Sequence, residues 1–125
     1  KIVPMRVAAD HSVALRDTDP RGLPVYGGDG ELAGTVVDLW VDRMEMMFRY
    51  LEVQTQGGRR VLVPIMFARI QRKAVQVHAL MAHQFEGVPA TRHPESITLL
   101  EEEKIPAYFG AGLLYASPER QEPLL

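Results

Sequence analysis

The feature that most constrains this chain is a series of short stretches in which apolar and polar residues alternate, several of them bounded by glycines. Alternation with a period of two is typical of a β-strand, whose successive side chains point to opposite faces. The stretches are separated by Gly27-Gly28-Asp29-Gly30 and by Gly57-Gly58. Glycine readily adopts the positive φ angles that tight hairpin turns require. The sequence therefore predicts a mainly β fold built from antiparallel hairpins.

The alternation also predicts which side chains face the core. In the strand after the first turn, one face is expected to carry Ala33, Thr35, Val37, Leu39 and Val41, and the other Asp38, Trp40 and Asp42. In the next strand, Leu51 and Val53 alternate with Tyr50, Glu52 and Gln54. Val75 and Val77 are expected to face inward, with Gln76 and His78 outward. Short strands at such regular spacing favour a small antiparallel barrel.

The last third of the chain predicts one helix. Thr98 is a helix-capping residue, and Glu101 stands three positions later, where it can bond back to the cap. Pro106 is expected to remove one backbone hydrogen bond from this helix and to kink it. Gly110 and Gly112 are expected to permit its end. The predicted organisation is a lead-in at 1–20, a barrel at 21–80, a connector at 81–97, a helical segment at 98–116 and a tail at 117–125.

Composition excludes several classes of function. At 125 residues the chain amounts to one domain. Its net charge of -2 and its pI of about 6.1 argue against a nucleic-acid-binding protein, which usually carries a basic excess. Because cysteine is absent, disulfides, thiolate nucleophiles and thiolate metal sites are excluded. No apolar run approaches the roughly 18 residues that a membrane span needs.

The usual catalytic motifs are also missing. The four histidines form no close pair of metal ligands, so no metal site is expected. The glycines around Asp29 match neither common nucleotide-binding pattern, and no serine stands in a G-x-S-x-G setting. We therefore do not expect an active site within this chain.

Carboxylates within the apolar stretch 36–53 are the main candidates for function. The spacing Asp42-x-x-Glu45 at the end of a strand can bring two carboxylates close enough to titrate as a coupled unit. The alternative is that both are solvent-facing charges, as most Asp and Glu residues are. Asp38 lies in mid-strand, where a structural hydrogen bond to a neighbouring turn is expected instead.

An apolar cluster follows directly after these carboxylates. It consists of Met44, Met46, Met47 and Phe48. Exposed apolar clusters on a charged domain often mark a surface that binds a partner. Methionine also packs adaptably, so the alternative is that these residues fill the edge of the core.

Several motifs, in this order, resemble a known family. "DPRGLPV", "VDLWVDR" with "RYLEV", and "TLLEEEK" followed by "GAGLLYA" resemble the H subunit of the photosynthetic reaction centre of purple bacteria, whose cytoplasmic domain is a PRC-barrel. The resemblance implies a six-stranded antiparallel barrel capped by a C-terminal helix. It implies a non-catalytic subunit at the cytoplasmic face of the bacterial inner membrane, packed on the L and M subunits. Family members also carry an N-terminal transmembrane helix and a linker, which these residues do not include.

The resemblance further assigns roles to individual residues. It places Asp42 and Glu45 on the proton path to the secondary quinone, with Arg49 and Glu102 in supporting electrostatic roles. It makes the methionine-rich cluster the candidate contact with L and M. It implies that the domain binds no cofactor itself, since bacteriochlorophyll, bacteriopheophytin, quinones and non-haem iron are held by partner subunits.

Two other functions remain as alternatives. One is a soluble adaptor with a PRC-type barrel, such as a ribosome-maturation factor. The acidic balance and the "TLLEEEK…GAGLLYA" segment count against this alternative. The other is a small acid/base enzyme that uses Asp42 and Glu45, for which the sequence shows no recognisable substrate pocket.

Overall fold

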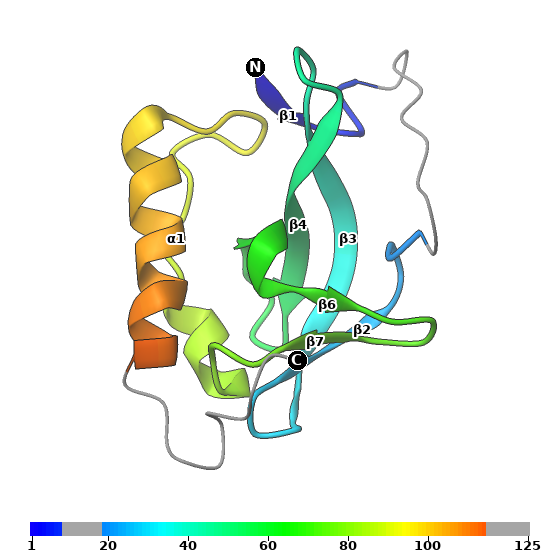
Figure 1. Cartoon of the computed structure of the whole chain (residues 1–125), viewed down its shortest axis with the longest axis vertical. Coiled ribbons are helices and arrows are strands. Elements are labelled where there is room, and N and C mark those ends of the chain that lie inside the picture. The colour runs from blue at the N-terminus through cyan, green and yellow to red at the C-terminus, as the bar shows by residue number, and fades with distance from the viewer. Residues whose placement is uncertain (9–18, 115–125) are drawn as a thin grey trace.

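The computed structural model describes residues 1–8 and 19–114 as a curled β-sheet with one long helix beside it (Figure 1). The mainly β fold with a C-terminal helix is as predicted. The elements in chain order are β1 (Ile2–Pro4), β2 (Pro24–Gly27), β3 (Leu32–Asp42), β4 (Met47–Thr55), β5 (Arg60–Pro64), the 3₁₀-helix η1 (Ile65–Phe67), β6 (Arg69–Ile70), β7 (Val75–Val77), the 3₁₀-helix η2 (Ala82–Gly87) and α1 (Leu99–Leu114).

The seven strands form one sheet, in the order β5-β4-β3-β2-β7-β6, with β1 also paired to β3. The long strand β3 lies at the centre of the sheet, because β4 pairs with one of its edges and both β2 and β1 pair with the other. β2 pairs near the start of β3, with Pro24 opposite Thr35, and β1 pairs near its end, with Ile2 opposite Asp42. The sheet is antiparallel except between β2 and β7, which run parallel. This parallel pair departs from the all-antiparallel prediction, and the chain connects its two strands through β3, β4, β5, η1 and β6.

The faces of β3 also differ from simple alternation. Thr35 is exposed and Val37 half-buried, although both were predicted to share a face with Ala33, Leu39 and Val41, which are buried. Val36 is buried as well. The pairing with β4 shifts between Val36 and Asp38, so that Val37 is the extra residue of a β-bulge. A bulge changes the directions in which the neighbouring side chains point, so the simple alternation of faces is interrupted there. Beyond the bulge, Asp38 and Trp40 are buried together with Leu39 and Val41.

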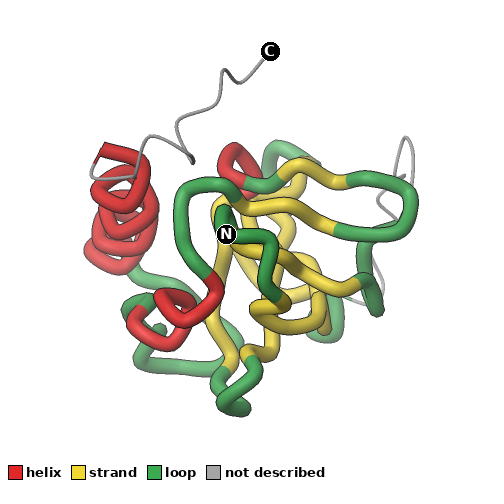
Figure 2. Tube along the Cα trace, turned by 90° about the horizontal axis from the view of Figure 1, so that it is seen from below, coloured by secondary structure: helices red, strands yellow, loops and turns green. Residues whose placement is uncertain are grey.

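Helix α1 closes the core on one side of the sheet, as the end-on view in Figure 2 also shows. Its buried residues are Ile105 and Phe109. The ring of Phe109 stacks on Phe67 at 5.6 Å between centroids and meets the edge of Phe85 at 6.4 Å. These contacts join α1 to η1 and η2. Aromatic contacts of this kind add to the stabilisation gained by burying the rings.

The predicted capping box is present at the start of α1. The backbone N–H of Glu101 donates to Oγ1 of Thr98 at 3.1 Å, and the N–H of Thr98 donates to Oε1 of Glu101 at 2.8 Å. Helix α1 continues through Pro106, Gly110 and Gly112 to Leu114, so neither glycine ends it. The last two positions of the predicted segment 98–116 lie outside the described residues.

Gly112 serves close packing rather than helix termination. A Cβ atom placed on it would lie 2.3 Å from the carbonyl oxygen of Ala79 and 2.8 Å from Cδ2 of Leu80. At Gly110 the same atom would meet nothing within 4 Å. Within the described ranges, no helix combines the length and the apolar character needed to cross a membrane.

Candidate functional site

The tip of the β3–β4 hairpin is organised by Asp42, the last residue of β3. Its Oδ1 accepts hydrogen bonds from the backbone N–H groups of Met44 at 3.0 Å and Glu45 at 3.2 Å. Its carbonyl oxygen accepts a hydrogen bond from the N–H of Met46 at 2.7 Å. Aspartate often stabilises turns in this way. Met46 completes the turn with a φ of 54°, in the left-handed region that non-glycine residues seldom adopt.

This turn brings three of the predicted site residues together. Nη2 of Arg49 donates to Oε1 of Glu45 at 2.6 Å and lies 3.6 Å from Oδ2 of Asp42. The pKa of Asp42 is lowered, first by the hydrogen bond from the N–H of Glu45, with the N–H of Met44 and the charge of Arg49 acting in the same direction. Asp42 is therefore firmly ionised in this domain. The three residues form an ionic triad, which we call the hairpin triad.

Glu102, the fourth predicted site residue, lies near a different group. Burial raises the pKa of Tyr50 to about 12, the negative charge of Glu102 adds to this effect, and the charge of Arg49 opposes it. Glu102 is thus close enough to affect the pKa of Tyr50, which follows Arg49 in β4. Within residues 1–8 and 19–114, no hydrogen bond or ion pair joins Glu102 to Asp42 or Glu45. Its supporting role in the site stays a prediction.

The methionine-rich cluster divides into two parts. Met44 is 86% exposed, and Met46 and Met47 are 45% and 47% exposed. These three side chains do not fill an edge of the core. Phe48 does, because it is half-buried and packs against both groups of buried apolar residues. The hairpin triad is thus bordered by three exposed methionines.

A second ionic cluster was missed by sequence reasoning. Nη1 of Arg6 donates to Oε1 of Glu52 at 2.7 Å and to Oδ2 of Asp38 at 2.9 Å. Glu52 also accepts from Nε1 of Trp40 at 2.8 Å and from Nη1 of Arg60 at 3.1 Å. The turn after β1, the strands β3 and β4, and the start of β5 therefore meet at one carboxylate. We call these five residues the barrel network.

The barrel network buries the carboxylate of Glu52 and contains the expected hydrogen bond of another carboxylate, that of Asp38. Glu52 alternates with Leu51 and Val53 along β4, yet it is only 4% exposed. Burial opposes its ionisation, but the hydrogen bonds from Arg6, Trp40 and Arg60 outweigh this effect and lower the pKa of Glu52. Asp38 makes the expected structural hydrogen bond to a neighbouring turn, in which Arg6 is the donor. No local signal could have revealed Glu52, because its partner Arg6 is 46 residues away.

The barrel network lies beside two cavities. Their volumes are about 390 and 420 Å³, and Arg6 and Arg60 line both. The carboxylates that reach these cavities are neutralised by the arginines and held by several hydrogen bonds. The lowered pKa of Glu52 makes this carboxylate a weak general base. In the described part of the chain, no group of three or more acidic or histidine side chains is arranged to hold a metal ion.

Comparison with known protein families identifies the family of this domain. The family model of the PRC-barrel domain matches residues 13–84, more than half of the chain. The chain belongs to the PRC-barrel family. The match includes strands β2 to β7 and the whole β3–β4 hairpin. Helix α1 lies beyond the matched range, so the PRC-barrel of this chain is followed by a helix that covers its core.

Proposed function

We propose that this PRC-barrel is the cytoplasmic domain of a reaction-centre H subunit, which stabilises the L and M subunits and conducts protons toward the secondary quinone. The observation that carries the proposal is the hairpin triad. Asp42, Glu45 and Arg49 stand together at one end of the barrel, bordered by exposed methionines. The resemblance of the ordered motifs to the H subunit supports the same conclusion.

The triad suits proton conduction next to a partner protein. Full reduction of a quinone consumes two protons, and a quinone buried in a membrane protein must receive them through ionisable groups and ordered water. In the free domain Asp42 is ionised, because its pKa is lowered. Contact with a partner would remove water from Asp42 and Glu45, and burial raises the pKa of a carboxylate. Docking would thereby bring the pair closer to the pH at which it exchanges protons.

Arg49 can contribute more than its charge. Its Nη2 contacts both carboxylates, so protonation of one carboxylate changes how readily the other binds a proton. Its Nε is buried and has no hydrogen-bond partner among the described residues. A buried N–H of this kind is a suitable donor to an ordered water molecule. The triad therefore combines coupled carboxylates with a donor for water.

The exposed methionines support the docking part of the proposal. Met44, Met46 and Met47 present polarisable, adaptable side chains, which suit an apolar partner surface. We place the domain at the cytoplasmic face of the photosynthetic membrane, with its barrel acting as a non-catalytic subunit. The bacteriochlorophyll, bacteriopheophytin, quinones and non-haem iron would all be held by the partner subunits.

Flash-induced absorbance kinetics of the assembled complex test the proton path. Glu45→Gln keeps the shape of the side chain but removes its titration. The first electron transfer between the quinones should change little, because it needs no proton delivered to the quinone. The second should slow by about tenfold or more, as expected when a positioned proton-transfer group is lost. Glu31→Gln is the matched control, since Glu31 is exposed in the β2–β3 turn.

The double variant Asp42→Asn with Glu45→Gln tests the coupling. If the two carboxylates act as one unit, the double variant should be less than multiplicatively slower than the single variants. Wild-type proton uptake in the double variant would show that the triad is only a surface ion pair. Purification of the native protein with ribosomal subunits, instead of pigment-bearing L and M chains, would favour the adaptor alternative.

A further inference from the structure

The basic residues of this chain are unevenly distributed. No Asp or Glu occurs between Glu52 and Glu86, although the chain as a whole has a net charge of -2. Two arginines of this span are bound within the domain. Arg59 donates to the carbonyl oxygens of Glu86 and Val88, and Arg60 donates to Glu52. The other cations of the span all belong to the β6–β7 hairpin.

That hairpin carries Arg69 in β6 and Arg72 and Lys73 in its turn. All three residues are exposed, and none forms an ion pair with another residue of the described ranges. In Figure 1 the hairpin projects to the right, away from the tip of the β3–β4 hairpin at the top. The basic surface is therefore separate from the hairpin triad and its methionines.

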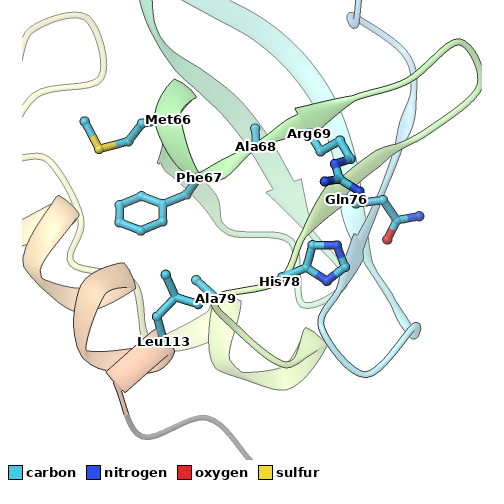
Figure 3. A pocket seen from close by; sticks show the side chains of 8 residues that line it. All are labelled: Met66, Phe67, Ala68, Arg69, Gln76, His78, Ala79 and Leu113. Carbon is cyan, nitrogen blue, oxygen red and sulfur yellow. The ribbon is translucent and has the colours of Figure 1, made fainter. Parts of the chain in front are cut away.

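A pocket of about 290 Å³ adjoins this hairpin. Figure 3 shows that its two sides differ in chemistry. On one side lie the side chains of Arg69, Gln76 and His78, which make no hydrogen bond to another described residue. On the other side lie Phe67 and Leu113, with the exposed Met66 nearby. The pocket thus joins an apolar wall to a row of polar side chains that have no partner among the described residues.

We propose that the β6–β7 face is a docking surface for an acidic segment of a partner protein that inserts one apolar side chain into this pocket. Charge complementarity supports an acidic occupant, because Arg69, Arg72 and Lys73 have no carboxylate partner within the described part of the chain. The apolar wall supports an anchor side chain, since a recessed pocket of this kind holds the residues that dominate binding energy in protein interfaces.

Binding of defined peptides to the whole chain tests the proposal. The probe is a fluorescein-labelled peptide in which one phenylalanine is flanked by two glutamates on each side, followed by fluorescence anisotropy at low salt. Replacing its phenylalanine by alanine should weaken binding about tenfold, because the buried apolar area is lost. Replacing its glutamates by lysines should abolish binding. Raising the salt concentration should weaken binding, because the cations are exposed.

Matched variants of the protein locate the surface. Lys73→Glu should weaken binding of the glutamate peptide about tenfold, whereas Lys104→Glu, a charge reversal on the exposed side of α1, should change it less than about twofold. Met66→Ala should weaken binding of the phenylalanine peptide but not of the alanine peptide. Met66 is 79% exposed, so this variant should remain folded.

Three results would overturn the proposal. Equal effects of Lys73→Glu and Lys104→Glu would show that only net charge matters. Equal binding of the phenylalanine and alanine peptides would show that the pocket takes no anchor. Binding to phosphatidylglycerol vesicles that is lost in Lys73→Glu, without binding of the peptide, would assign this face to a lipid surface instead.

Discussion

Among single residues, Glu52 joins several distant segments of this domain. It is a buried carboxylate that two arginines and an indole N–H satisfy from different parts of the chain. Removing one partner of a buried ion pair usually costs more than the pair itself contributes, because the other charge is left without compensation. Here the remaining charge would be that of Arg6, which also holds Asp38.

The lowered pKa of Glu52 predicts how stability depends on pH. Its pKa lies below the ordinary value of 4.5, so the unfolded chain takes up a proton before the folded chain does. The contribution of Glu52 to stability is therefore fully present above about pH 4.5 and is lost as the pH falls through the folded-state pKa. Urea denaturation from pH 7 to pH 3 should show this loss in the wild-type protein.

Glu52→Gln isolates this contribution from those of other carboxylates. At pH 7 the variant should be less stable by about 2 kcal/mol, since hydrogen bonds to a charged group are lost. The difference in unfolding free energy between wild type and variant should shrink on acidification. A difference that stays constant with pH would show that Glu52 is not ionised in the folded protein.

At the scale of elements, helix α1 depends on its first turn and on its last. The capping box of Thr98 and Glu101 satisfies backbone N–H groups that the helix itself cannot satisfy. Thr98→Ala should therefore lower the unfolding free energy by about 1 kcal/mol. Thr98→Ser, which keeps the hydroxyl, is the control and should be nearly neutral. Thermal or urea denaturation measures both variants, and an unchanged Thr98→Ala protein would show that the cap does not contribute.

The two glycines near the end of α1 should respond oppositely to the same substitution. Gly112→Ala places a methyl group against the backbone oxygen of Ala79, and overpacking of this kind costs about 1–3 kcal/mol. Gly110→Ala meets open space, and alanine is favoured over glycine within a helix by about 1 kcal/mol. Urea denaturation should thus show one destabilised and one stabilised variant. Equal effects would mean that α1 does not approach the Ala79–Leu80 segment closely.

For the whole molecule, the exposed methionines distinguish stability from assembly. Met47 is 47% exposed, so Met47→Asp should leave the unfolding free energy of the domain nearly unchanged. If the β3–β4 tip contacts the L and M subunits, the same variant should weaken assembly, because a charge would be buried against an apolar surface. The yield of the intact complex on gel filtration measures assembly. Loss of domain stability would instead show that Met47 belongs to the core.

Much of the fold follows from local sequence patterns. The strands follow from alternation and glycine turns, and the start of α1 follows from Thr98 and Glu101. The hairpin triad was also predictable, because Asp42, Glu45 and Arg49 lie on one turn and the strand that follows it. Residues this close along the chain are brought together by local backbone geometry alone. Their part in a proton path is still a proposal.

Only the tertiary structure decided the features that join distant segments. The parallel pairing of β2 with β7, the contact of Gly112 with Ala79, and the burial of Glu52 beside Arg6 all depend on how the sheet curls. Alternation indicates which residues share a face of a strand. It does not indicate whether a distant cation is present to neutralise a carboxylate on that face. A charged side chain can be buried where an oppositely charged partner compensates it. Only the folded chain brings such a distant partner within reach.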